Sequence, residues 1–155
     1  MTTACVVNSA KINRMRKLRV LLADDHDAFR EAMCMFLDMQ PDVEVVAQVA
    51  DGASVLREFG TSGADVVCMD IEMPGSSGID TTRALLAQWP SARVVGLSAH
   101  ADVQRAAAML NAGALGYVLK GSPTAQLLNA IRAASRNQHY LDAALGVSSV
   151  HDLPA

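Results

Sequence analysis

The chain has 155 residues, of which 51% are hydrophobic and 19% are charged. This length and composition predict one folded domain with an adequate core and argue against intrinsic disorder. The 13 basic side chains are outnumbered by 16 acidic ones, which gives a net charge of −3. Because nucleic-acid-binding domains usually carry a basic excess, we expect no nucleic acid contact by this chain itself. No apolar run approaches the ~20 residues that span a bilayer, so no membrane association is expected.

The cysteines bear on the cellular compartment, and the first residues on whether the chain has an N-terminal extension. Cys5, Cys34 and Cys68 are odd in number and lack the spacing of a metal site, which predicts reduced thiols in a cytoplasmic protein. Residues 1–16 contain basic side chains but no acidic one. We interpret them as a disordered N-terminal extension, with a targeting signal as the alternative. Met15 is a candidate for the true initiator.

The first half of the chain alternates strand and helix patterns. Short apolar runs of strand length are separated by segments whose apolar residues recur at helical spacing. Strands are predicted over 18–23, 43–50 and 65–69, and helices from just after Asp25 to about Met39 and from Gly52 to a closing Gly60. The loop composition of residues 72–78 then leads to the next helix.

The second half continues the alternation. The predicted elements are a helix from Ile79 to before Pro90, a strand over 93–97, a helix from Val103 to Asn111, a strand over 115–119, and a last helix with Ser122 as N-cap and Pro123 at its first position, fading near Arg136. The strands are apolar on both faces, which is typical of a parallel sheet covered on both sides. We therefore predict an α/β fold with a flavodoxin-like, doubly wound five-stranded sheet of order 2-1-3-4-5.

Polar side chains follow the predicted strands at their carboxyl ends. Asp24 and Asp25 follow the first strand, and Asp70, Ser98 and Lys120 follow the third, fourth and fifth. In this strand order the switch point lies between the first and third strands, where ligands bind. Each pair of carboxylates packed ~4 Å apart repels by roughly 4 kcal/mol at an effective dielectric constant of ~20.

A hard divalent cation would remove that repulsion. Oxygen ligands without His or Cys favour Mg²⁺ over zinc. Asp70 is the best candidate nucleophile, since Asp24 and Asp25 adjoin each other and can share the metal, while the Lys120 ammonium can hold a phosphoryl oxygen. The set suits Mg²⁺-assisted phosphoryl transfer onto an aspartate.

Four motifs occur in order at these strand ends. They are Leu-Leu-Ala-Asp-Asp-His at 21–26, Met-Asp-Ile-Glu-Met-Pro-Gly at 69–75, Leu-Ser-Ala at 97–99 and Gly-Ala-Leu-Gly-Tyr-Val-Leu-Lys at 113–120. The chain thereby resembles the receiver domain of two-component response regulators, and most closely the subfamily that often carries a LuxR-type helix-turn-helix. The resemblance covers residues 17–136, and residues 137–155 would be a C-terminal tail or a truncated linker.

The resemblance implies a role for each residue that matches the family pattern. Asp70 would accept a phosphoryl group from a phosphohistidine of a sensor histidine kinase or phosphotransfer protein. Mg²⁺ would be bound by Asp25, Asp70 and the backbone carbonyl of Glu72, with Asp24 acting mainly through water. The phosphoryl-binding and switch residues would be Ser98, which moves to hydrogen-bond the phosphoryl group, Lys120, which contacts it, Tyr117, which turns inward, and Ala99, which leaves access to the aspartate.

The resemblance leaves the downstream target of phosphorylation open. The chain would be a phosphoacceptor that assists its own phosphorylation and dephosphorylation, not an enzyme in the ordinary sense. It would act either alone on a downstream protein or as part of a LuxR-type transcription regulator with a DNA-binding domain. Homodimerisation on phosphorylation is a further option that the sequence leaves open.

Other interpretations compete with this one. The acids at 24 and 25 could cap a helix, Asp70 could be a turn residue, and Lys120 a solvated strand end. His26 and His100 lie near the same edge, and we assign them no catalytic role. A rival function is a Mg²⁺-dependent phosphohydrolase with an aspartyl nucleophile, since Asp25 and Asp27 have an Asp-x-Asp spacing. A third option is a scaffold that is never phosphorylated.

Overall fold

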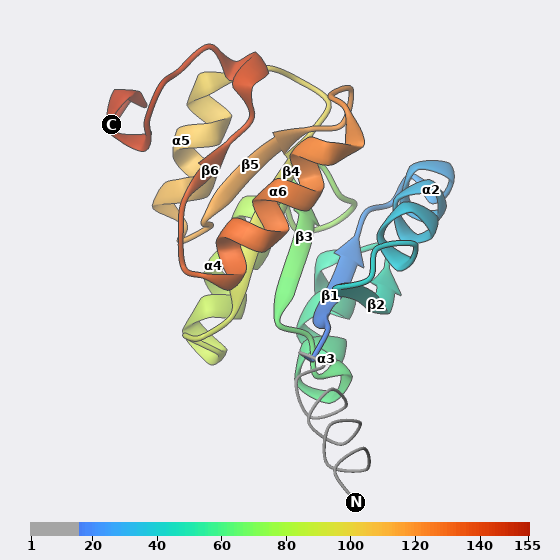
Figure 1. Ribbon diagram of the computed structural model, residues 1–155. Helices are drawn as coiled ribbons and strands as arrows, with labels where there is room; N and C mark the ends of the chain where they lie inside the picture. Colours follow the sequence, from blue (N-terminus) through green and yellow to red (C-terminus); the bar gives the residue numbers. More distant parts are fainter. Residues whose placement is uncertain (1–15) are drawn as a thin grey trace, which may run out of the picture.

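A six-stranded parallel sheet forms the centre of the molecule. The computed structural model describes residues 16–155 (Figure 1). The strands are β1 (Leu18–Ala23), β2 (Val43–Val49), β3 (Val66–Asp70), β4 (Arg93–Ser98), β5 (Gly116–Leu119) and β6 (Tyr140–Leu141). Their order is β2-β1-β3-β4-β5-β6, and every neighbouring pair is parallel. The predicted flavodoxin-like order is thus confirmed, and a short sixth strand extends it.

Helices cover both faces of the sheet (Figure 1). They are α2 (Asp27–Asp38), α3 (Gly52–Ser62), α4 (Gly78–Gln88), α5 (Val103–Asn111) and α6 (Thr124–Ser135). Side chains alternate along each strand, so Leu21 of β1 belongs to the core layer that includes residues of α3, α4 and α5, whereas its neighbour Leu22 belongs to the layer that includes residues of α2 and α6. Both leucines are buried, and each such burial contributes roughly 1.5–3 kcal/mol. Two apolar layers therefore hold the sheet rigid beneath its carboxyl edge.

Two predicted helix ends were wrong. α3 continues past Gly60 to Ser62 and ends at Gly63, whose φ of +69° is a left-handed conformation that favours glycine. Gly60 is instead a close contact, because a Cβ there would come within 2.9 Å of the Trp89 ring. α6 begins at Thr124 with Pro123 as its N-cap, since Pro123 has an extended ψ of 143°. Ser122 therefore lies before the cap position to which it was assigned.

The segment predicted as a tail or linker is packed against the domain. β6 pairs with β5 through Gly116–Tyr140 and Tyr117–Leu141, and the 3₁₀ helices η1 (Ala143–Leu145) and η2 (Val150–Asp152) follow. Leu145 is buried in the main core. The sequence analysis missed β6, because a two-residue strand has no period to detect. Within 137–155, the structure thus shows a sheet edge and core residues.

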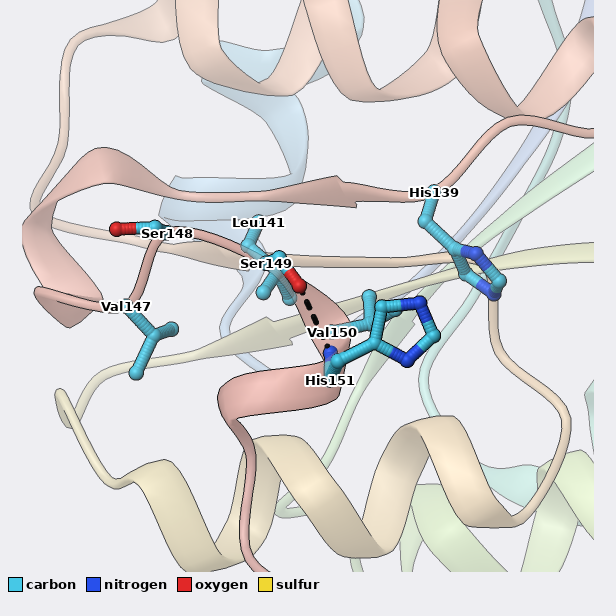
Figure 2. Close-up of a pocket in the computed structure, with 7 residues that line it drawn as sticks. All are labelled: His139, Leu141, Val147, Ser148, Ser149, Val150 and His151. Atoms are coloured by element: carbon cyan, nitrogen blue, oxygen red, sulfur yellow. Dashed lines mark hydrogen bonds between the residues drawn. The ribbon is translucent and has the colours of Figure 1, made fainter.

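This C-terminal segment encloses a hollow of about 340 Å³ (Figure 2). Its lining comes from the segment itself: His139, Leu141 and residues 147–151. The Ser149 hydroxyl accepts a hydrogen bond of 3.0 Å from the backbone N–H of His151, which fixes the turn into η2. The lining contains none of the residues predicted to carry the chemistry, so this hollow is separate from the candidate site.

The N-terminal predictions mostly fall outside the described residues. This holds for the disordered extension up to residue 15 and for Met15 as initiator. Arg16, the first described residue, forms an ion pair of 3.2 Å with Asp65. Among residues 16–155, no helix has the length and apolar character that crossing a bilayer requires.

Asp142 ties the C-terminal segment to β5, and its removal should destabilise the fold. Its carboxylate is almost fully buried and accepts hydrogen bonds of 2.9 Å from the backbone N–H groups of Leu119 and Ala144. We expect Asp142→Ala to lower the free energy of unfolding by about 1–3 kcal/mol, because two backbone N–H groups lose their buried acceptor. Urea denaturation measures this, with the exposed Asp152→Ala as matched control. Equal stability of the two variants would show that the Asp142 side chain does not contribute to holding the segment on β5.

Candidate functional site

The carboxyl edge of the sheet brings together three acids and one lysine. Asp24 and Asp25 directly follow β1, Asp70 ends β3, and Lys120 directly follows β5. The Lys120 Nζ lies 2.7 Å from Asp24 Oδ2 and 3.0 Å from Asp70 Oδ2. Asp24 and Asp70 are each 2% exposed, whereas the Asp25 side chain is about one-third exposed. Two buried carboxylates thus share one ammonium, and the third opens toward solvent.

His26 joins this cluster, although the sequence analysis gave it no role. Its Nδ1 lies 3.1 Å from Asp24 Oδ1, 3.5 Å from Asp25 Oδ1 and 3.9 Å from Asp70 Oδ2. The Lys120 Nζ is 3.3 Å from the same nitrogen. The sequence signal was its position directly after the acidic pair, at the start of α2. That position alone did not show which way the ring points.

The cluster has the chemistry of a site for a hard cation. Side-chain ligand atoms of Asp24, Asp25, His26 and Asp70 all lie within 4.8 Å of one another. One buried oxygen of each aspartate (Asp24 Oδ2, Asp25 Oδ1 and Asp70 Oδ2) has no hydrogen-bond partner within residues 16–155. The lysine contacts two of these oxygens as an ion pair, and its single charge does not balance three carboxylates. Buried carboxylate charge that is only partly compensated is costly unless a further cation binds it, and carboxylate oxygens suit Mg²⁺.

The surroundings of Asp70 favour the protonated form of its carboxyl group. Burial raises the pKa of its carboxyl group to about 6, and the charge of Asp24 adds to this rise. Lys120 and the backbone N–H of Glu72, which donates to Asp70 Oδ1 at 3.1 Å, act in the opposite direction. Without a further cation, Asp70 therefore holds a proton well above the range of an ordinary aspartate. A bound divalent cation would favour the ionised, nucleophilic form.

The residues predicted to sense a phosphoryl group contact one loop. The Ser98 hydroxyl accepts a hydrogen bond of 3.1 Å from the His100 N–H and lies 3.3 Å from the His100 carbonyl. The Tyr117 hydroxyl donates to that same carbonyl at 3.3 Å. The Tyr117 ring is fully buried, so it already has the inward orientation assigned to the switched state, and burial raises the pKa of its phenol. Ala99 is exposed beside this loop.

Neighbouring residues hold the cluster in place. Gly78, at the start of α4, packs on the backbone of Asp70 so closely that a Cβ would come within 2.2 Å of the Asp70 carbonyl oxygen. The Arg30 guanidinium on α2 donates to the Asp24 carbonyl. The Phe29 ring lies 5.1 Å from the Lys120 Nζ, a distance at which a ring face attracts a cation. The sequence analysis missed these supports, because each depends on tertiary placement.

Comparison with known proteins agrees with this geometry. A family model described as the response regulator receiver domain matches residues 20–132. The chain belongs to the response regulator receiver family. Among curated relatives, the transcriptional regulatory protein LiaR of Bacillus subtilis is 36% identical over 125 residues, 81% of this chain and 59% of the relative. The oxygen regulatory protein NreC of Staphylococcus haemolyticus is 35% identical over 136 residues, 87% of this chain and 63% of the relative.

Solved structures give the same result. A LuxR-family two-component response regulator from Aurantimonas sp. SI85-9A1 matches with a TM-score of 0.80 and 32% identity, covering 84% of this chain and 93% of that one. This receiver chain spans about three-fifths of the length of the curated relatives named above. Receiver domains of this family are not classical enzymes. They bind Mg²⁺ at an acidic site and pair with sensor histidine kinases and with output domains such as LuxR-type DNA-binding domains.

The raised pKa of Asp70 predicts a specific pH dependence of stability in the absence of metal. The folded-state pKa of about 6 exceeds the ordinary value of 3.8, so ionised Asp70 destabilises the fold above pH ~6, and protonation relieves this as the pH falls from ~6 toward ~4. Asp70→Asn should therefore raise the free energy of unfolding at pH ~7.5 by about 2–3 kcal/mol.

Urea denaturation in EDTA at pH ~7.5 and at pH ~4 measures the difference in free energy of unfolding between the variant and the unsubstituted protein. The gain should largely vanish near pH ~4, where Asp70 is already neutral. The exposed substitution Asp80→Asn should leave stability nearly unchanged at either pH, since its side chain is 65% exposed. A gain in the Asp70 variant that is the same at both pH values would show that carboxylate repulsion is not its cause.

Proposed function

We propose that Asp70 accepts a phosphoryl group from a phosphohistidine of a sensor histidine kinase or a phosphotransfer protein, in a Mg²⁺-dependent reaction. The observation that carries the proposal is the convergence of three carboxylates, with one buried oxygen each, on a single lysine whose Nζ lies 2.7 Å from Asp24 and 3.0 Å from Asp70. Membership of the receiver family supports it.

The contacts support the division of metal ligands that the family resemblance implies. Asp25 and Asp70, with the backbone carbonyl of Glu72, would hold the ion directly, because the Asp25 side chain is the most exposed of the three acids and Asp70 is the proposed acceptor. Asp24 would act through water, since its Oδ2 is already engaged by Lys120 at 2.7 Å. When bound, Mg²⁺ would neutralise negative charge on the incoming phosphoryl group.

The chain supplies the nucleophile and a cation for the transfer. An Asp70 oxygen attacks phosphorus, the P–N bond of the phosphohistidine breaks, and the imidazole leaves with the electron pair, so an acyl phosphate forms. Lys120 contacts both Asp24 and Asp70 before the reaction. After transfer its ammonium group would form an ion pair with the new phosphoryl oxygens on Asp70. Ala99, which has only a methyl side chain, would leave the approach to Asp70 open.

Conformational switching would pass through the loop between β4 and α5. Ser98 would exchange its bonds with His100 for one to the phosphoryl group, and the His100 carbonyl would then hold only Tyr117. Moving a two-state equilibrium from 1:99 to 99:1 requires about 5.5 kcal/mol of differential interaction. Charge-assisted bonds from Ser98 and Lys120 to a phosphoryl group are of this order. The responding surface would be α5, β5 and α6.

The output would be a change in a partner surface or in an attached domain. The relative LiaR is named a transcriptional regulatory protein, and the Aurantimonas structure is of the LuxR family. We therefore favour control of a LuxR-type DNA-binding domain over action on a separate protein. Dimerisation after phosphorylation would be the means by which such a domain engages DNA.

The rival phosphohydrolase loses its main support in the structure. Its Asp-x-Asp motif would need Asp27 beside Asp25 at the site. Asp27 instead starts α2 with its side chain 77% exposed, and it pairs with Arg30 at 2.8 Å. It does not belong to the carboxylate cluster.

Phosphorylation by a small donor tests the proposed acceptor. With acetyl phosphate and Mg²⁺, intact mass should show one added phosphoryl group per chain, and EDTA should prevent it. Asp70→Asn should abolish the labelling, because the nucleophile is gone, whereas Asp80→Asn on exposed α4 should be labelled normally. Labelling of the Asp70 variant at the normal rate would disprove the assignment. Continuous turnover of a phosphate ester by the purified protein would favour the hydrolase.

A further inference from the structure

A second charged pair lies at the rim of the Asp70 site, outside the cluster itself. Glu72 is two residues past Asp70, and its backbone N–H is bonded to the Asp70 carboxylate. Its side chain forms an ion pair with the Arg105 guanidinium, 33 residues further along the chain on α5. His100 Nε2 lies 4.0 Å from the same Glu72 oxygen. The acceptor loop and the start of α5 are thus joined by charge across the mouth of the site.

Arg105 is held in this position by its own helix. Asp102 caps α5, and its Oδ1 accepts hydrogen bonds from the backbone N–H groups of Gln104 and Arg105 at 2.9 and 3.2 Å. Its Oδ2 lies 3.5 Å from Arg105 Nε. A cation in the first turn of a helix is unfavourable with respect to the helix dipole. The pairing with Glu72 and Asp102 offsets that cost and aims the guanidinium at the acceptor loop.

The Glu72–Arg105 ion pair affects the local charge at the mouth of the site more than it affects the stability of the fold. Both side chains are 40–50% exposed, and exposed ion pairs contribute little to folding. A phosphodonor, however, is an anion that must approach an edge already carrying Asp24, Asp25 and Asp70. Glu72 would add a fourth negative charge there, and Arg105 cancels it.

We propose that Arg105 is a positioning residue for phosphoryl transfer: by pairing with Glu72 it removes a negative charge from the path of the anionic donor and ties the acceptor loop to α5. The proposal rests on Asp70 as the acceptor. It assigns to Arg105 an effect on the rate of phosphorylation that acts through Glu72 and not through direct contact with the reacting atoms. In that reaction the acyl C(O)O–P bond of acetyl phosphate breaks, acetate leaves with the electron pair, and the Asp70–P bond forms.

The test is the rate of labelling of the full chain by acetyl phosphate at saturating Mg²⁺. Arg105→Gln should slow labelling on the order of fivefold, as expected for one uncompensated charge roughly 8 Å from the doubly charged acetyl phosphate in a largely aqueous setting. The slowing should fade as salt rises from roughly 0.05 to 0.5 M, because salt screens exposed charges. Arg105→Lys should retain most of the rate.

A double variant distinguishes an effect of the uncompensated Glu72 charge from a structural effect of losing the Arg105 side chain. Glu72→Gln keeps the backbone carbonyl that is assigned to the metal and removes only the side-chain charge. Combined with Arg105→Gln it should restore the rate to within about twofold, because the uncompensated carboxylate is then absent. Arg83→Gln, which breaks the exposed Arg83–Asp80 pair on α4, is the matched control and should change nothing.

Two results would overturn the proposal while leaving Asp70 as acceptor: labelling of Arg105→Gln at the normal rate, or a double variant as slow as the single one. Absence of labelling at Asp70 in the unsubstituted chain would overturn both proposals. The two failures are therefore distinguishable by whether the unsubstituted protein gains a phosphoryl group at that residue.

Discussion

The repulsion among carboxylates buried at one edge of the sheet determines how the rest of this structure must be arranged. Asp24 and Asp70 are each 2% exposed and share a single ammonium, that of Lys120. Burial raises the pKa of Asp70 to about 6, so the metal-free site is strained in its ionised form. Such a site binds a divalent cation or a proton favourably, and the receiver family uses the cation. The two apolar layers under the sheet supply the rigidity that keeps the acids together.

The same edge is connected to distant parts of the molecule through backbone groups. The His100 carbonyl accepts a hydrogen bond from the Tyr117 hydroxyl and lies beside the Ser98 hydroxyl. A movement of Ser98 can therefore affect Tyr117, which is buried on β5. Asp142 holds the N–H of Leu119, the residue before Lys120, and so links the C-terminal segment to the lysine that spans the acids. The candidate output surface and the chemical site are therefore parts of one hydrogen-bonded unit.

The sequence was sufficient for the sheet order and for bringing Asp24, Asp25, Asp70 and Lys120 to one edge, because a parallel sheet places the carboxyl ends of its strands side by side. Asp24 and Asp25 follow one apolar strand, and Asp70 ends another. This is enough to predict that the three acids lie at the same edge of the sheet, without knowledge of packing. Features that depend on side-chain direction or on distant pairing were missed. His26 turns toward the acids, and β6 has only two residues; neither leaves a periodic signal. The burial of Tyr117 without a bound phosphoryl group could not be predicted either, since it depends on packing against the loop that follows β4.

Anomalous diffraction from crystals of this chain grown with Mn²⁺, an oxygen-preferring stand-in for Mg²⁺, tests the central claim most directly. The account predicts one anomalous peak at the carboxyl ends of β1 and β3, in contact with carboxylate oxygens of Asp25 and Asp70 and with the Glu72 carbonyl, and within reach of Asp24 only through water. An ion bound elsewhere, or a vacant carboxylate cluster in saturating Mn²⁺ at neutral pH, would contradict it.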